Sequence, residues 1–258
     1  MSNNKYEDKL NADQWGDIFN IEKYAKALID SIEGKRYYTQ TIEMLKIAQP
    51  NCKTLEIGAG SGQTSLCLAR AGCEVTLLDF SEQALDLARY AAKKLGLSIK
   101  TVCADATKEL PFQEKEFDVV FHAGLLEHFE PHERVTLLKH WRPFGKKHIS
   151  MVPNAASLSY RIGKEIQENN GTWQWGRELP AYTQIKEFIL SGFDVDDEYT
   201  SGELQSLNFL DKDNPLKALL SDLWNRRSQA GLVDNFNQGY LLVTIGNNHA
   251  KEVSYEQT

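Results

Sequence analysis

The sequence has 258 residues, enough for one large domain or for one domain with a smaller cap. Its hydrophobic fraction of 41% and charged fraction of 25% are ordinary for a soluble globular protein. The formal net charge of −7 argues against broad contact with nucleic acid, which normally needs a basic face, but leaves room for a local basic patch.

No apolar run approaches the ~18 residues of a membrane span, and the polar N-terminal residues lack the apolar core of a secretory signal. The four cysteines, Cys52, Cys67, Cys73 and Cys103, form no CxxC pair and lie in or beside apolar segments. This placement is typical of buried, inert thiols. We therefore expect a cytoplasmic protein in a reducing compartment, with no membrane contact.

The predicted elements begin with helices and continue as an alternating series. From residue 12, apolar residues recur at spacings of three and four, which predicts a helix that Gly34 interrupts. A second helix is expected from Tyr37 to Ile47. Strands are then expected at 53–57, 74–79, 98–105, 117–123 and 147–152, with helices at 64–72, 81–96 and 125–140. Successive βα units with short connections predict a parallel sheet covered by helices on both faces.

The C-terminal part follows a different pattern. A helix is expected at 181–191, followed by strands at 193–199 and 239–245. The roughly forty residues between those strands, helical around 216–227, are long for a hairpin loop and suggest an inserted cap or interface element at about 200–238. The final polar stretch is expected to fray.

The stretch LEIGAGSGQ, residues 55–63, joins the first strand of this series to a helix. Gly58, Gly60 and Gly62 let the backbone pass close to a ligand, and the helix that follows offers its N-terminus. The spacing GxGxG lacks the third glycine of the dinucleotide fingerprint GxGxxG, because Gln63 stands there. A carboxylate, Glu56, precedes the first glycine by two residues.

Two more carboxylates end the next strands, Asp79 after the second and Asp105 after the third. ExGxGxG, the two aspartates and FDVVFHAGLLEHF together resemble a class I S-adenosylmethionine-dependent methyltransferase, over about residues 53–152. The resemblance implies a doubly wound, Rossmann-like sheet of seven strands, mostly parallel with a C-terminal antiparallel pair. It also implies a lid formed by residues 1–50 over a methyltransferase domain at 51–258.

The resemblance assigns a cofactor role to each matching position. Glu56 is expected to help hold the amino end of S-adenosylmethionine, directly or through water, above a loop formed by the three glycines. The ribose hydroxyls are expected at Asp79, the adenine against Phe80, and the adenine amino group at Asp105 with the Ala106 amide nearby. His122 is expected to line the site beside the methionine portion.

Two alternatives to a methyltransferase remain open. An NAD-binding oxidoreductase would also need a ribose acid at Asp79, but Glu56 and the missing third glycine favour the methyltransferase. A domain that binds adenosylmethionine without transferring methyl, as a sensor or assembly subunit, would keep the same binding residues. Turnover separates this last alternative from an enzyme.

The chemistry that the sequence supports is in-line methyl transfer, in which positioning can dominate. No catalytic residue is assigned; His128 is the candidate general base for a hydroxyl acceptor, with structural packing as its alternative. No histidine and carboxylate cluster has metal-ligand spacing, since His128 and His132 flank Pro131. We therefore expect no metal.

The acceptor is expected to be a small molecule, with an oxygen or nitrogen acceptor left undetermined. A [DN]PPY motif, typical of enzymes that methylate base amino groups, is replaced by HAGL, and the charge is acidic, so nucleic acid is disfavoured. Trp173 and Trp175 could sandwich a flat or apolar substrate or could anchor packing. Tyr37 could form part of the lid with Tyr38, or pack in the core. The oligomeric state is not indicated.

Overall fold

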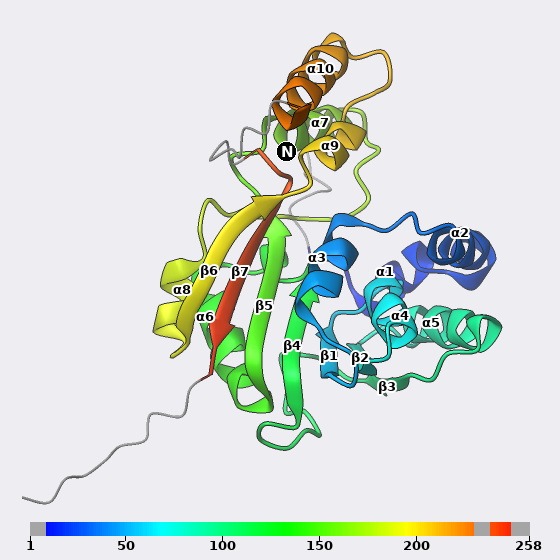
Figure 1. The fold of residues 1–258 in the computed structure, drawn as a ribbon, viewed down its shortest axis with the longest axis vertical. Coiled ribbons are helices and arrows are strands. Elements are labelled where there is room, and N and C mark those ends of the chain that lie inside the picture. The colour runs from blue at the N-terminus through cyan, green and yellow to red at the C-terminus, as the bar shows by residue number, and fades with distance from the viewer. Residues whose placement is uncertain (1–8, 230–237, 249–258) are drawn as a thin grey trace, which may run out of the picture.

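The structure is a computed structural model that describes residues 9–229 and 238–248. Its centre is a seven-stranded sheet with the order β3-β2-β1-β4-β5-β7-β6 (Figure 1). The strands are β1 (Lys53–Ile57), β2 (Glu74–Asp79), β3 (Lys100–Cys103), β4 (Phe117–Ala123), β5 (Gly145–Pro153), β6 (Asp194–Ser201) and β7 (Leu241–Asn247). Strands β1 to β5 pair in parallel, whereas β7 is antiparallel to both of its neighbours, so the predicted fold class is confirmed.

Successive residues along the central strands belong to two cores, one on each face of the sheet. Leu77 and Val119 pack in one core, while the next residues in each strand, Leu78 and Val120, pack in the other. The first core lies under α3 (Thr39–Ile47), α4 (Gln63–Arg70) and α5 (Glu82–Leu95). The second lies under α6 (Pro131–Trp141) and α8 (Ile185–Leu190), which completes a doubly wound arrangement.

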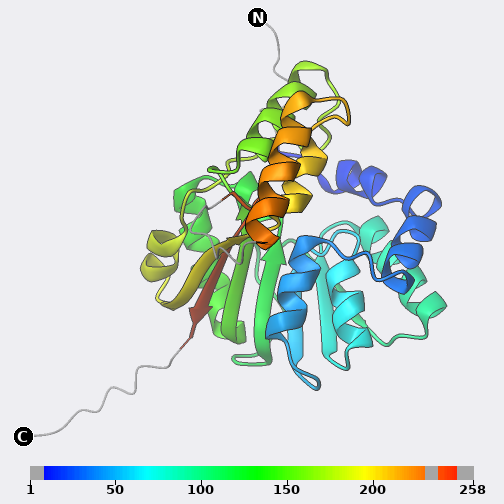
Figure 2. The ribbon, with the colours of Figure 1, turned by 45° about the horizontal axis from the view of Figure 1, so that its top comes forward.

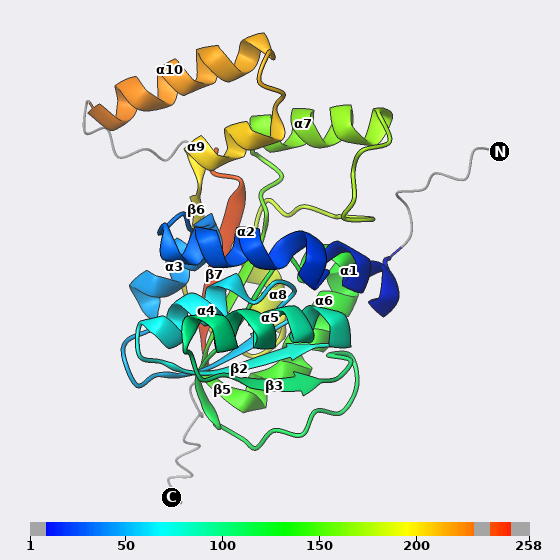
Figure 3. The same ribbon diagram turned by 90° about the vertical axis from the view of Figure 1, so that its right-hand side faces the viewer.

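An extra layer covers the first of these faces. Helix α1 (Ala12–Ile18) begins with a capping box at Asn11, and α2 (Ile21–Glu33) begins at the side-chain cap of Asn20. The apolar stripe of α2, with Leu28 and Ile32 buried, packs on α4 and α5. Figure 3 shows both helices running across α4 and α5.

A second group of helices stands beyond the carboxyl ends of β4 and β5, at the top of Figures 1 and 2. It contains α7 (Leu158–Asn169), α9 (Glu203–Ser206), the 3₁₀ turn η3 (Leu207–Phe209) and α10 (Pro215–Gln229). These elements share a small apolar core around Leu210 and Trp224. The predicted insertion at about 200–238 corresponds in part to this group, with 230–237 outside the described residues.

Three element predictions need correction. The helix expected at 125–140 is broken: a 3₁₀ turn, η1 (Leu126–His128), precedes α6, whose first residue is Pro131. A second 3₁₀ turn, η2 (Arg142–Phe144), follows α6. The helix expected from residue 181 begins only at Ile185, and α7 was not predicted. The predicted fraying of the C-terminus lies outside the described residues. None of the described helices has the length and apolar character needed to cross a bilayer.

Candidate active site

The glycine loop adopts a backbone that only glycine takes without strain. Gly58, Gly60 and Gly62 have φ angles of 69°, 51° and 70°, all in the left-handed region. A Cβ on Gly62 would lie 2.8 Å from Leu77 in β2 and 2.9 Å from Ala88 in α5, so this glycine permits close packing of the start of α4 against both elements. A Cβ on Gly60 would lie 2.9 Å from the ring of Phe19, which follows α1 in the chain. The loop is therefore covered by the N-terminal segment.

Two buried carboxylates lie beside this loop. Asp79 accepts hydrogen bonds from the Gly60 amide and the Ser81 amide, both at 2.9 Å, and so ties the end of β2 to the loop. Glu56 accepts hydrogen bonds from the Ser65 hydroxyl at 2.6 Å and the Ser65 amide at 3.2 Å. Burial raises the pKa of Glu56 to about 7 and also raises the pKa of Asp79.

A cavity of about 600 Å³ opens at the carboxyl ends of β1, β2 and β4. Most of the residues expected to bind the cofactor line it: Glu56, Gly58, Gly60, Asp79, Phe80, Asp105 and Ala106. Phe80 is 39% exposed although it is aromatic, so a flat ligand face remains available beside the strand-end acids. Asp105 accepts hydrogen bonds from the Thr107 amide and hydroxyl at 2.9 and 2.7 Å.

Three expected residues lie elsewhere. His122 is within β4, where it pairs with Ser150, and does not line the cavity; the residue is 2% exposed, and its ring centroid lies 5.8 Å from that of Trp141. Burial lowers the pKa of His122 to about 3. Gly62 also lies outside the lining, and Tyr37 packs in the core under α2 while Tyr38 lines the cavity. The expectation that His122 lines the site is therefore wrong, because strand β4 continues past it.

An aromatic roof, defined as Trp15, Phe19, Tyr24 and Trp175, covers one side of the cavity. Trp175 lies with its ring centroid 6.1 Å from that of Trp15 and 6.3 Å from that of Phe19. Phe19 also lies 6.0 Å from Trp15 and 5.9 Å from Tyr24. The roof joins the N-terminal helices to the segment that follows α7.

Trp173 belongs to a different group. Its indole nitrogen donates to the Gly176 carbonyl at 3.0 Å, and its ring lies 6.4 Å from Tyr160 and 4.7 Å from the Lys164 ammonium. Both tryptophans line the cavity, but each is engaged by different neighbours.

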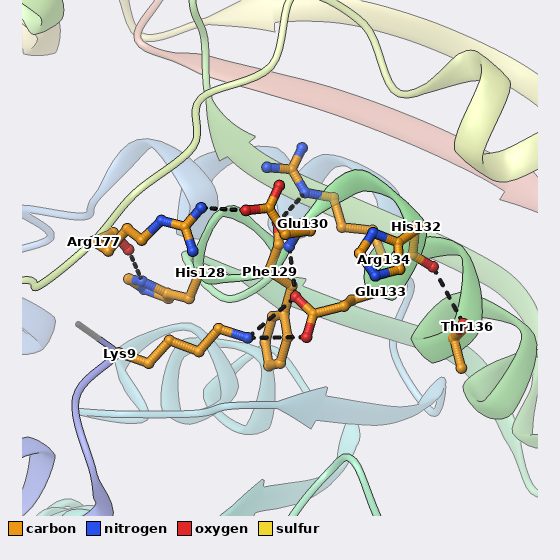
Figure 4. Close-up of polar contacts among 9 residues, drawn as sticks. All are labelled: Lys9, His128, Phe129, Glu130, His132, Glu133, Arg134, Thr136 and Arg177. Atoms are coloured by element: carbon orange, nitrogen blue, oxygen red, sulfur yellow. Dashed lines mark hydrogen bonds and ion pairs between the residues drawn. The ribbon is translucent and has the colours of Figure 1, made fainter. Parts of the chain in front are cut away.

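The turn after β4 binds two distant segments (Figure 4). The Lys9 ammonium lies over the Phe129 ring at 4.1 Å and pairs with Glu133 at 3.2 Å. The His128 Nδ1 lies 2.7 Å from the Arg177 carbonyl oxygen, and the Arg177 guanidinium pairs with Glu130. Because a carbonyl only accepts, Nδ1 carries the proton. Burial lowers the pKa of His128, so the ring is neutral near pH 7.

Three further residues of the cavity wall were missed by sequence reasoning: Glu127, Tyr160 and Glu178. The Tyr160 hydroxyl donates to Glu178 at 2.5 Å, and Glu127 is 2% exposed. Burial raises the pKa of both carboxyl groups, that of Glu178 to about 7. The LLEHF motif could have indicated Glu127, but nothing in the spacing points to Glu178.

The comparisons with known proteins agree with this geometry. A family described as "Methyltransferase domain" matches residues 54–147. The ubiquinone biosynthesis O-methyltransferase of Idiomarina loihiensis is 33% identical over an alignment 176 residues long, and the match covers 57% of this chain and 72% of that protein. The uncharacterized methyltransferase YbaJ of Bacillus subtilis is 40% identical over 70 residues, 27% of this chain and 28% of the relative. Several other curated relatives are likewise covered over about a third of their length.

A solved structure shares the fold across nearly the whole chain. Magnesium protoporphyrin IX methyltransferase from Synechocystis PCC 6803, crystallised with bound SAH, has a TM-score of 0.54 and 15% identity, covering 91% of this chain and 92% of that one. That likeness concerns the fold alone, but the Idiomarina relative is 33% identical and is covered over more than two thirds of its length. With the family match and the carboxylates around the glycine loop, this shows that the chain belongs to the class I S-adenosylmethionine-dependent methyltransferases.

Proposed function

We propose that this protein transfers the methyl group of S-adenosylmethionine to a hydroxyl group of a small molecule. The observation that carries the proposal is a single cavity that contains both the cofactor residues and a second set of polar side chains, Glu127, Tyr160 and Glu178, beside the aromatic roof. Its volume of about 600 Å³ is within the usual range for small-molecule sites. The name of the Idiomarina relative, an O-methyltransferase, favours oxygen as the acceptor atom.

The cofactor half of the cavity has the donors and acceptors that such a ligand needs. The resemblance gives Asp79 the ribose hydroxyls, Asp105 the adenine amino group and Phe80 the adenine face. Glu56 faces the cavity with a carboxylate suited to an ammonium group. Bound S-adenosylmethionine supplies a methyl group made electrophilic by its sulfonium; the chain orients it and limits water around it.

The acceptor half lies between the turn after β4 and the segment that follows α7. Trp15, Phe19 and Trp175 form an apolar surface there, and Glu127, Tyr160 and Glu178 provide the polar one. A flat or apolar acceptor with a hydroxyl group fits both surfaces. The net charge of −7 supports a small molecule over nucleic acid.

We further propose that the N-terminal lid expected at residues 1–50, of which the structure describes 9–50, covers this cavity. The close approach of Phe19 to Gly60 and the Lys9–Glu133 ion pair support the proposal, since both contacts hold the N-terminal segment across the site. The four cysteine thiols, two of them buried, support a reducing compartment such as the cytoplasm.

The proposal is tested by incubating the purified protein with S-adenosylmethionine carrying a deuterated methyl group and a panel of phenols, alcohols and matched amines. Mass spectrometry of the acceptors and assay of S-adenosylhomocysteine report transfer. Labelled methyl on a hydroxyl compound is expected. Labelled methyl on amines alone would contradict the oxygen assignment, and cofactor binding without transfer to any acceptor would favour the sensor alternative.

A further inference from the structure

We propose that Glu127, His128 and Glu178 form a divalent-cation site at the acceptor end of the cavity, suited to Mg²⁺ or Mn²⁺. One ligand atom from each residue can be chosen so that all three lie within 4.8 Å of one another. All three residues line the cavity. The position of the site as an acceptor site rests on the proposed function; its ability to bind a cation does not.

Backbone contacts hold the segments that carry these three residues next to one another. Glu127 and His128 are neighbours on the 3₁₀ turn η1, whereas Glu178 comes from the segment that follows α7. Hydrogen bonds join these segments on both sides of Glu178: His128 Nδ1 donates to the Arg177 carbonyl at 2.7 Å, and the Leu179 amide donates to the Glu127 carbonyl at 2.7 Å. The arrangement is therefore fixed by the fold rather than by flexible side chains.

The Glu127 carboxylate provides an independent observation. Its Oε2 atom is buried and has no hydrogen-bond partner among the described residues. The nearby Arg134 guanidinium donates instead to the carbonyls of Phe129 at 2.9 Å and Leu179 at 2.5 Å. A buried, unpaired carboxylate oxygen is costly, and a cation bound between Glu127 and Glu178 would satisfy it.

The hydrogen bonds behind the ligand atoms have the pattern of a metal site. With the proton on Nδ1 directed to the Arg177 carbonyl, Nε2 of His128 carries the lone pair that a metal needs. The Tyr160 hydroxyl orients Glu178 in the same way, through its hydrogen bond to Oε2. Metal-ligating histidines and carboxylates are commonly supported by such partners.

Two carboxylates and one imidazole form an oxygen-rich set that suits Mg²⁺ or Mn²⁺. Three protein ligands leave coordination positions for the acceptor oxygen and water. A cation there would lower the pKa of a bound acceptor hydroxyl, whose proton passes to water. The oxygen lone pair then forms the new bond to the methyl carbon, while the carbon–sulfur bond breaks with its electron pair on sulfur. His128 would thus act as a ligand and not as the base.

The test uses the full chain, treated with EDTA, dialysed and titrated with Mn²⁺ by electron paramagnetic resonance. One bound Mn²⁺ per chain, displaced by excess Mg²⁺, is expected. Glu127→Gln and Glu178→Gln, which lie on different segments, should each weaken Mn²⁺ binding at least about tenfold. Glu165→Gln on the exposed face of α7 is the matched control and should bind Mn²⁺ as the unchanged protein does.

Affinity for S-adenosylmethionine, measured on the same samples, shows that each variant is folded. The absence of bound Mn²⁺ at millimolar concentration in folded protein would overturn the inference. So would glutamine variants that both bind Mn²⁺ as tightly as the unchanged protein does. Mn²⁺ binding in a protein that methylates no hydroxyl compound would leave the site in place and refute the proposed function. Full methylation of a hydroxyl compound after EDTA treatment, in protein that binds no Mn²⁺, would support the proposed function and refute the cation site.

Discussion

Replacing Gly60 by alanine tests whether the N-terminal segment closes on the glycine loop. Gly60 has φ of 51°, where an alanine costs about 1–2 kcal/mol. The new Cβ would also lie 2.9 Å from two atoms of the Phe19 ring, and displacing that ring costs about 1–3 kcal/mol more. The Gly60→Ala variant should therefore lose about 2–5 kcal/mol of unfolding free energy.

The two costs separate in a double-mutant cycle with Phe19→Ala. In the Phe19→Ala background the steric cost disappears, and Gly60→Ala should cost only the backbone share of about 1–2 kcal/mol. Gly96→Ala is a matched control, since Gly96 has φ of 66° at the end of α5 and a Cβ added there would meet no atom within 4 Å. Gly96→Ala should lower the free energy of unfolding by the backbone cost alone, about 1–2 kcal/mol, both in the unchanged protein and in Phe19→Ala.

Urea unfolding followed by circular dichroism provides the four free energies, provided that the transition is two-state. A coupling of about 1–3 kcal/mol between the two sites is expected. Additivity within about 0.5 kcal/mol would refute the contact between Phe19 and the loop, and with it the structural basis of the lid.

Two buried groups and the aromatic roof give three more predictions. Burial raises the pKa of Glu56 to about 7, and an ammonium ligand needs the ionised carboxylate. Calorimetry should therefore show that the affinity for S-adenosylmethionine falls roughly tenfold from pH 7.5 to pH 6 in the unchanged protein, but not in Glu56→Gln. Burial lowers the pKa of His122 to about 3, so the folded state resists protonation of the ring, and the free energy of unfolding should fall as pH drops below about 6.5. His122→Phe should make this fall shallower without changing the affinity for the cofactor. Weaker cofactor binding by His122→Phe would indicate that His122 does contribute to the site. Trp175→Ala removes two ring contacts and should raise amide exchange in residues 12–33; unchanged exchange would show that the roof does not hold the N-terminal helices.

The sheet was predictable because its signals are local. Apolar strand runs, helical periodicity and the glycines of 58–62 each act within a few residues, and together they specified the order of strands and helices. Asp79 and Asp105 both line the cavity, as expected of residues at the ends of neighbouring parallel strands, which meet at one edge of the sheet.

The rest depended on contacts that sequence spacing does not encode. His122 was misplaced because the last residues of β4 remain paired with β5, which turns its ring toward Trp141. Glu178 follows Glu127 by 51 positions in the chain, and hydrogen bonds between two irregular segments bring the residues together. The expectation of no metal rested on local spacing alone, which does not encode the long-range approach of Glu178 to Glu127 and His128 on which the proposed cation site rests.

The most direct test of the account is calorimetric titration of the cofactor-free protein with S-adenosylmethionine, with NAD as the control and Asp79→Ala as the matched variant. Binding in the micromolar range, about −8 kcal/mol, is expected for the unchanged protein, with no response to NAD. Asp79→Ala should bind about one to three decades more weakly, since charge-assisted hydrogen bonds contribute roughly 1.5–3 kcal/mol each. Folded protein that binds NAD, or binds neither ligand, would contradict the account.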